Sequence, residues 1–258
     1  MAHIRLENAA IDFEVRDVAQ QRLLHPEFFR SFLGGRLGLT DKNHVIVSAL
    51  DGINLSLEGG NRLGILGHNG SGKSTLLRLM AGVYAPTRGT VQTEGRISTL
   101  FDVSLGMDME ISGSDNIRLQ SLIFGMSPQE LEEKLPDIEE FTQLSDFLSL
   151  PVRTYSSGMQ ARISFGVATA LEPDILLLDE VIGTGDTAFM DRAVARLERF
   201  LERPNILAIA SHSLDTLRRF CDLGLVLEKG RLVYFGGIED AIRAYEERIA
   251  EIAHAERP

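Results

Sequence analysis

Cysteine, basic residues and long apolar runs are all scarce in this sequence. Cys221 is the single cysteine, so no disulfide can form within the chain and nothing points to an oxidising compartment. No apolar run approaches the roughly 20 residues of a membrane-spanning helix, and the first residues lack the apolar core of a signal peptide. We therefore expect a protein with cytosolic chemistry, which leaves docking on a membrane protein open.

Basic side chains are too few for a protein whose main task is to hold duplex nucleic acid. The chain has 26 Lys and Arg against 37 Asp and Glu, a formal net charge of −11, whereas such proteins usually carry a basic surplus. Hydrophobic residues at 44% and charged residues at 24% are ordinary for a globular chain and exclude a disordered one. The length of 258 residues predicts one large domain, or one domain with an appended subdomain. The acidic net charge predicts that nucleic acid is not a partner.

A glycine-rich stretch fits the phosphate-binding pattern G-x-x-x-x-G-K-[ST] at every fixed position. It follows the short apolar run 62–66 and precedes a run with helical spacing, so its context is strand, loop and helix. Glycine lets backbone N–H groups approach phosphates, and the helix adds the positive end of its dipole. A glycine-rich turn that binds nothing is the alternative, and this context disfavours it. We expect a nucleoside triphosphate to be bound, with Lys73 on the β- and γ-phosphates and the Ser74 hydroxyl on Mg²⁺. The whole predicted loop is Gly67, His68, Asn69, Gly70, Ser71, Gly72, Lys73 and Ser74.

Two further apolar runs end in polar side chains suited to phosphate chemistry. Residues 175–178 are followed by Asp179 and Glu180, and residues 206–210 by a serine and His212. A carboxylate at the end of a strand beside a phosphate loop is where Mg²⁺ is held, which fits Asp179. Glu180 is placed to deprotonate an attacking water, and His212 to touch a γ-phosphate. Chance placement of the acids and a structural histidine are the alternatives.

Alternating apolar side chains ahead of the phosphate loop predict an antiparallel β-layer. The alternation appears from Ile4 to Val15 and again from Ile53 to Leu57. Between these segments, residues 22–36 predict a short helix bordered by arginine and ended by a glycine pair. Its apolar face consists of Phe28, Phe29, Phe32 and Leu33. This face either docks on a membrane protein near the lipid headgroups or packs on its own domain.

The second half of the chain predicts helices, a hairpin and one more candidate anion site. Residues 112–150 have helical patterns that begin near Ser114 and at Ser127. Ser157, with glutamine three residues later, has the pattern of a capping box at the head of a helix. That helix start is either a simple cap or an anion site, because its small residues leave N–H groups accessible. A hairpin over 225–235 and a helix from Ile238 follow.

Five motifs, taken in order, resemble those of the nucleotide-binding subunit of an ABC transporter. They are a Walker A loop at 67–74, a signature at 155–162, Walker B at 175–180, a D-loop at 183–186 and a switch histidine at 212. The order and the gaps are those of the family, and the match runs almost from end to end.

The signature resembles that of a narrower group, the exporters of bacterial cell-surface polysaccharides. It is YSSGM at 155–159, where the common form is LSGGQ, and the run 179–186 is similar to theirs as well. An insert ahead of the phosphate loop is also found in that group, where it includes a short helix thought to gate entry of the glycan. The resemblance implies export of O-antigen, capsule or teichoic-acid chains.

The resemblance also implies a nucleotide site shared between two copies of the chain. The copies would face each other head to tail as a homodimer with two-fold symmetry. Phe13 would stack on the adenine ring. The other ATP contacts would come from Lys73, Ser74 and Thr75 of one copy and from Ser156, Ser157 and Gly158 of the other.

Hydrolytic roles follow from the same resemblance. Glu180 would be the catalytic base, and His212 would hold the γ-phosphate and the water in line. Mg²⁺ would be bound by Ser74 and Asp179. Where most of the superfamily has a Q-loop glutamine, the best alignment places Asp102, and this departure weakens the case for a Mg²⁺ contact there.

The implied fold is α/β, a P-loop NTPase (RecA-like) core with an antiparallel β-subdomain and an inserted α-helical subdomain. We expect a single ABC ATPase domain over residues 1–258. Its predicted parts are a β-layer at about 1–61 with the insert helix at 22–36, a nucleotide-binding core at 62–100 and 172–237, a helical subdomain with the signature at 101–171, and a C-terminal helix at 238–258.

The leading hypothesis is an ATPase that drives a lipid-linked cell-surface polysaccharide across the bacterial inner membrane. It would work at the cytoplasmic face with a polytopic permease as partner, and with ATP and Mg²⁺ as cofactors. Transport of another substrate, a lipid or a drug, is the alternative. A soluble ABC-type ATPase acting on DNA or ribosomes is disfavoured, because the chain has neither a long coiled-coil insert nor tandem cassettes.

Overall fold

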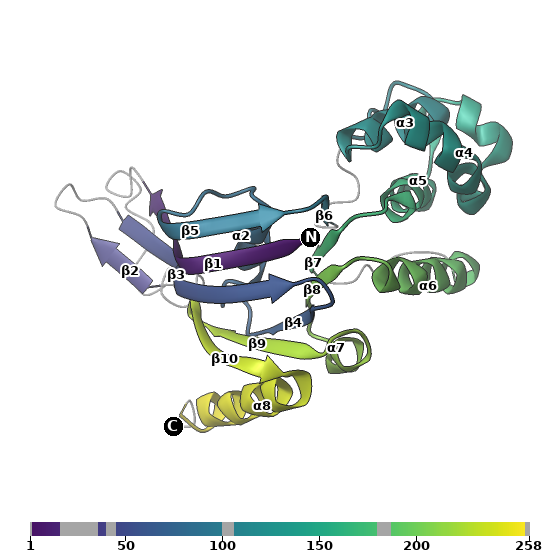
Figure 1. Ribbon diagram of the computed structural model, residues 1–258. Coiled ribbons are helices and arrows are strands. Elements are labelled where there is room, and N and C mark those ends of the chain that lie inside the picture. Colours follow the sequence, from purple (N-terminus) through teal and green to yellow (C-terminus); the bar gives the residue numbers. More distant parts are fainter. Residues whose placement is uncertain (1, 16–35, 40–44, 100–105, 180–186, 256–258) are drawn as a thin grey trace. The chain divides into compact units, whose positions relative to one another are not determined.

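The computed structural model describes residues 2–15, 36–39, 45–99, 106–179 and 187–255 (Figure 1). The chain divides into two compact units, one formed by 1–97, 174–180 and 205–258 and the other by 98–173 and 181–204. Within the described ranges, no helix is both long enough and apolar enough to span a bilayer. The helix predicted at 22–36 lies outside the described residues except for its last position, where a strand begins.

The first unit contains a four-stranded antiparallel sheet with the order β2-β3-β1-β5. Its strands are β1 (His3–Val15), β2 (Arg36–Leu39), β3 (Val45–Glu58) and β5 (Arg88–Glu94). In the register of β1 with β3, Ile4 faces Leu57 and Phe13 faces Val47. Along β1, Ile4 and Leu6 are buried and Arg5 between them is exposed, as the period of two requires. The antiparallel layer predicted from this alternation is confirmed.

A six-stranded, mostly parallel sheet with the order β10-β9-β4-β8-β7-β6 forms the core of the same unit. Its strands are β4 (Arg62–Leu66), β6 (Ile97–Thr99), β7 (Ile175–Asp179), β8 (Ile206–Ala210), β9 (Leu223–Glu228) and β10 (Arg231–Gly237). β8 is buried along its whole length, which explains its continuous apolar sequence. β9 and β10 form the predicted hairpin.

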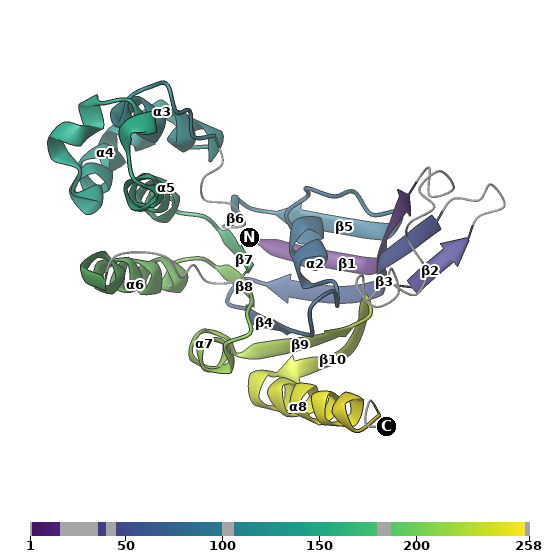
Figure 2. The ribbon, with the colours of Figure 1, turned by 180° about the vertical axis from the view of Figure 1, so that it is seen from behind.

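Three helices pack on the sheets of the first unit. They are α2 (Lys73–Met80), α7 (Leu214–Phe220) and α8 (Ile238–Ala255). α2 contacts strands of both sheets, and Figure 2 shows it in front of the four-stranded sheet. α8 packs on β9 so closely that a Cβ on Gly224 would lie 2.3 Å from the Cβ of Ala241. α8 begins at Ile238, as predicted from the sequence.

The second unit is helical. Its helices are α3 (Gly113–Ile123), α4 (Pro128–Thr142), α5 (Ser157–Ala170) and α6 (Thr187–Glu202), with short 3₁₀ turns at Ser145–Ser149 and Val152–Thr154. α4 packs on α5, and α5 on α3 and α6. α6 groups with this unit, whereas the sequence placed residues 172–237 together in the core. The domain boundaries remain a prediction.

Two helix starts in this unit differ from the predicted ones. The N-cap of α3 is Ser112, not Ser114, and that of α5 is Ser156, not Ser157. In each case the serine with an extended backbone accepts from the N–H three residues later, which at α5 is the N–H of Met159. A run of adjacent small polar residues offers several caps, and backbone conformation selects one. At α4 the prediction is confirmed, with a capping box formed by Ser127.

Candidate functional site

The phosphate loop runs from the end of β4 to the start of α2 in the first unit. Gly67, Gly70 and Gly72 have φ angles of 154°, 78° and 109°. A Cβ on Gly72 would lie 2.8 Å from the carbonyl oxygen of Ala49, and one on Gly67 would lie 2.4 Å from Ser71 Oγ. Only glycine leaves this backbone unstrained and this close-packed. The loop therefore forms a cradle of the kind that fits a triphosphate.

Lys73 is held against the loop by the loop's own backbone. Its Nζ donates to the carbonyl oxygens of Gly67 at 2.6 Å and His68 at 3.2 Å, and the residue is 8% exposed. These contacts hold an ammonium group at the N-terminus of α2, where the helix dipole also favours an anion. Positive charge is thus concentrated where the loop opens.

The loop borders a cavity of about 540 Å³ within the first unit. This volume lies in the range of cofactor-binding sites. Lys73, Asp179 and His212, predicted from three distant stretches of sequence, all line it. The other lining residues are Phe13, Val47, Ala49, Asn69, Gly70, Gly72, Ser74 and Thr75.

The parallel sheet explains how these distant residues meet. Asp179 ends β7 and pairs with Ala210, the last residue of β8, and His212 follows two residues later. β8 in turn pairs with β4, which leads into the phosphate loop. The carboxyl ends of parallel strands share one edge, where ligands bind in open α/β sheets.

Ser74 and Asp179 provide the oxygen donors that suit Mg²⁺ beside a bound triphosphate. Among the described residues, no group of three or more His, Cys, Asp or Glu is gathered as a metal site. A phosphate-bound Mg²⁺ needs few protein ligands, because phosphate oxygens and water complete its coordination. The residues present therefore fit this metal.

Phe13 lies on the cavity wall, and its ring contacts a second aromatic ring. It is 39% exposed, and its ring packs edge-on against that of Tyr84 with centroids 5.5 Å apart. Tyr84 follows α2, the helix that begins at the phosphate loop. Two residues across the strand pair, Val47 and Ala49, also line the cavity. This apolar wall suits a flat base.

His68, although part of the loop, lines another space. Its Nδ1 lies 2.7 Å from the carbonyl oxygen of Asn69. Its side chain borders a small apolar recess together with Tyr245, Arg248 and Ile249 of α8. The backbone carbonyl of His68, rather than the ring, is what contacts Lys73.

The signature residues form the N-terminus of α5 in the second unit. Ser156 is the N-cap, and Ser156, Ser157 and Gly158 are all exposed. Gly158 has nothing close to the position of a Cβ except Ser156 Oγ at 3.8 Å. This helix start is therefore open to a ligand or partner from outside its own unit.

Three predicted features lie outside the described residues. They are Glu180, Asp102 and the D-loop at 183–186. Their predicted roles remain predictions.

Sequence reasoning missed Val47 and Ala49 at the cavity, and Tyr84 as the residue whose ring contacts Phe13. Val47 is the cross-strand partner of Phe13, so a correct register for the two strands would have placed it there. Tyr84 carries no signal in its local sequence, because its contact with Phe13 depends on the path of the chain after α2.

Comparison with known proteins identifies the family of the chain. The profile of the ABC transporter family matches residues 50–183. The chain is 42% identical to an O-antigen export system ATP-binding protein of Yersinia enterocolitica, over 91% of this chain and 97% of that protein. It is 35% identical to a teichoic acids export ATP-binding protein of Lactococcus lactis, over 82% of this chain but 45% of that protein.

Solved structures show the same fold. An ATP-binding subunit of an ABC transporter superposes with a TM-score of 0.66 at 21% identity, covering 94% of this chain and 93% of that one. A dimeric ATP-binding cassette, bound to ADP and Pi after hydrolysis, superposes with a TM-score of 0.63 at 19% identity, covering 91% and 98%. Together with the family match and the 42% identical relative, these findings show that the chain belongs to the ABC transporter family, as one of its ATP-binding proteins.

Proposed function

We propose that the chain is the ATP-hydrolysing subunit of an exporter that moves a lipid-linked cell-surface polysaccharide across the bacterial inner membrane. The observation that carries the substrate class is the alignment with an O-antigen export protein over 97% of that protein's length. The nucleotide chemistry is supported by the cavity that Lys73, Asp179 and His212 line together. Its permease partner is a polytopic membrane protein, and the chain works at the cytoplasmic face.

The proposed reaction is hydrolysis of the terminal phosphate of ATP. Lys73 and the loop N–H groups hold the triphosphate, and Phe13 stacks on the base. Ser74 and Asp179 would hold Mg²⁺, which would supply positive charge beside the triphosphate. Glu180 takes the proton of the attacking water as the water oxygen bonds to the γ-phosphorus. The bond from that phosphorus to the β–γ bridging oxygen breaks, and ADP and phosphate leave.

The remaining groups complete this reaction centre. His212 orients the water and the γ-phosphate. Asp102 is a further candidate ligand of Mg²⁺. The second unit contributes Ser156, Ser157 and Gly158 to the nucleotide of a second copy, because their helix N-terminus is open. A dimeric cassette of the same fold supports this pairing. ATP binding would then close the dimer and move the permease.

The test is an export assay in cells that lack the gene. The expected result is lipid-linked glycan accumulating inside while surface glycan disappears, with rescue by the wild-type gene but not by Lys73→Met. Normal surface glycan in the deletion strain would overturn the proposed substrate. Purification from solubilised membranes should recover the chain with a polytopic membrane protein, and recovery of the chain alone would overturn the proposed partnership.

A further inference from the structure

The turn between β9 and β10 contacts the phosphate loop on one side and strand β3 on the other. The N–H of Asp51 donates to the carbonyl oxygen of Gly230 at 2.8 Å, and the N–H of Gly230 donates to that of Ser71 at 2.9 Å. A Cβ on Gly230 would lie 2.6 Å from the carbonyl oxygen of Ala49. Three distant segments are thus in backbone contact at the rear of the loop.

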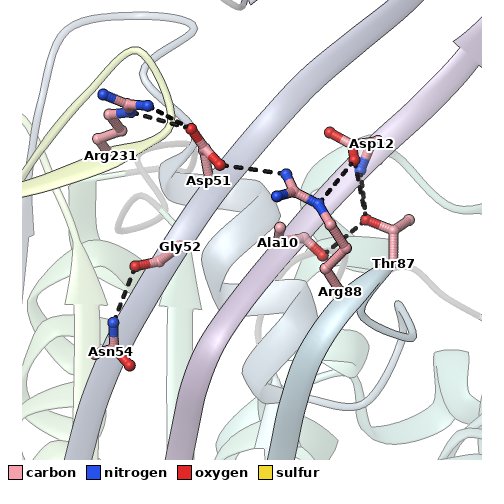
Figure 3. Close-up of polar contacts among 8 residues, drawn as sticks. All are labelled: Ala10, Asp12, Asp51, Gly52, Asn54, Thr87, Arg88 and Arg231. Carbon is pink, nitrogen blue, oxygen red and sulfur yellow. Dashed lines mark hydrogen bonds and ion pairs between the residues drawn. The ribbon is translucent and has the colours of Figure 1, made fainter.

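The carboxylate of Asp51 extends this contact into the four-stranded sheet (Figure 3). Its Oδ2 accepts from Arg231 Nη2 at 2.7 Å and Nε at 3.1 Å, and its Oδ1 accepts from Arg88 Nη2 at 3.2 Å. The side chain is 22% exposed. The hydrogen bond from Arg231 is the largest cause that lowers the pKa of Asp51, so the group is fully ionised at neutral pH.

Arg88 carries the contacts on to the strand of the base-binding residue. Its Nε lies 3.6 Å from Asp12 Oδ2, and the backbone N–H of Asp12 donates to Thr87 Oγ1 at 3.2 Å. Asp12 directly precedes Phe13, which lines the cavity. Figure 3 shows Arg88 lying between Asp51 and Asp12. The set therefore connects the phosphate loop at one end to the base-binding strand at the other.

The backbone of the sheet is irregular at this level. The register of β1 with β3 shifts between Leu6 and Ala9 and twice more before Asp12. Asn8, Gly52 and Gly89, one from each of the three strands, have positive φ. Bulges bend strands and interrupt the hydrogen-bond ladder. The ladder alone therefore holds the spacing between loop and Phe13 less firmly than a regular sheet would.

We infer that Asp51 is a positioning residue, whose contacts with Arg231 and Arg88 set the spacing between the triphosphate-binding and base-binding halves of the nucleotide site. The inference rests on the proposed binding of ATP in this cavity. Partly exposed ion pairs add little to global stability. The contribution of this network is to position the two distant segments that it joins, rather than to stabilise the fold. The contacts of Lys73 with the loop carbonyl groups do not involve the carboxylate of Asp51, so we expect triphosphate binding to survive the loss of that charge.

The test compares two ligands on Asp51→Asn, which keeps the shape of the side chain and removes its charge. ATP spans both halves of the site, whereas inorganic tripolyphosphate occupies only the loop. We expect the Kd for ATP to rise about three- to thirty-fold, with tripolyphosphate binding unchanged within about two-fold. In the ATPase assay KM should rise and kcat should stay, because binding is lost equally in ground and transition states.

The matched control is Asp174→Asn, a carboxylate in the same unit that accepts from the N–H of Arg96 at 2.9 Å and from Asn205 at 3.3 Å. It should alter the melting temperature without altering either affinity. Arg231→Gln should weaken ATP binding as Asp51→Asn does. The double variant should be little weaker than either single variant, because both substitutions break the same contact between Asp51 and Arg231. If Asp51→Asn does not fold, Arg231→Gln is used for the test instead.

Several outcomes overturn the inference. Equal weakening of ATP and tripolyphosphate would make Asp51 a structural support of the loop, and unchanged ATP affinity would give it no role in binding. Failure of the wild-type chain to bind ATP would instead refute the proposed function.

Discussion

Lys73 is a nearly buried cation whose ammonium group donates hydrogen bonds to backbone carbonyl oxygens. A triphosphate would add formal negative charge beside this ammonium group, which the neutral carbonyl groups do not carry. Lys73→Met keeps the aliphatic stem and removes the charge. Hydrogen bonds to charged groups are worth about 1.5–3 kcal/mol, so we expect the Kd for ATP to rise roughly ten- to hundred-fold. Titration calorimetry measures this directly. Lys134→Ala, which removes an ammonium group from the helical unit, should leave the affinity unchanged.

Cys221 illustrates a reactive group made inert by burial. It is 4% exposed, and burial raises the pKa of its thiol to about 12, from an ordinary value of 9.0. Because the thiolate is the nucleophile, the native protein should react slowly with a thiol reagent at pH 8 and fast in guanidinium chloride. Folding favours the protonated thiol, so its contribution to stability is full below pH 9.0 and is lost progressively as pH rises toward 12. Rapid native labelling at pH 8 would contradict this burial.

At the scale of one element, α5 shows how a cap selects a helix start. Ser156 Oγ accepts from the N–H of Met159 at 3.3 Å, whereas Ser157 is the first helical residue. Ser156→Ala should therefore lower the free energy of unfolding by about 1 kcal/mol. Ser157→Ala should change it by less than about 0.5 kcal/mol. Urea unfolding without nucleotide, followed by circular dichroism, compares the two, and a larger loss in Ser157→Ala would restore the cap expected from the sequence.

Elements with a strong local signal could be predicted from the sequence. The alternation in β1 and β3, the apolar run of β8 and the proline-marked start of α4 all led to correct elements. The caps of α3 and α5 were one or two residues off, because neighbouring serines are equivalent in sequence and differ only in backbone angles. Asp179 and His212 could also be predicted to lie near the phosphates, because both follow apolar strands and ligands bind at the carboxyl ends of parallel strands.

The contacts of Asp51 had no such rule. Its partners Arg231 and Arg88 lie 180 and 37 residues away, and no periodicity connects them. Which charged residues meet depends on the bulges in β1 and β3 and on where the β9–β10 turn lies. Information of this kind belongs to the tertiary fold, so it becomes accessible once strand register and turn position are known.

At the scale of the whole molecule, the proposed site is divided between two copies. In this proposal each copy would supply a phosphate loop for one nucleotide and a signature for the other, so the two sites of a pair would be separable by mutation. Glu180→Gln, which removes the proposed base, should trap ATP in a dimer detectable by gel filtration. In the Glu180→Gln background, adding Lys73→Met removes the ammonium group with which the phosphate loop would bind ATP. Adding Gly158→Asp instead places a negative charge at the signature, where it would repel the phosphates. Either addition alone damages both sites of a homodimer.

Mixing the two doubly substituted chains restores one site. In a mixed pair, the intact loop of the Gly158→Asp copy faces the intact signature of the Lys73→Met copy, while the other site carries both defects. We therefore expect trapped ATP at two per dimer for Glu180→Gln alone, near none for either double variant, and about one per mixed dimer. Nucleotide released from gel-filtered dimers measures this ratio. If each double variant retained ATP in a stable dimer, the loop and signature would act independently, and the shared site would be wrong.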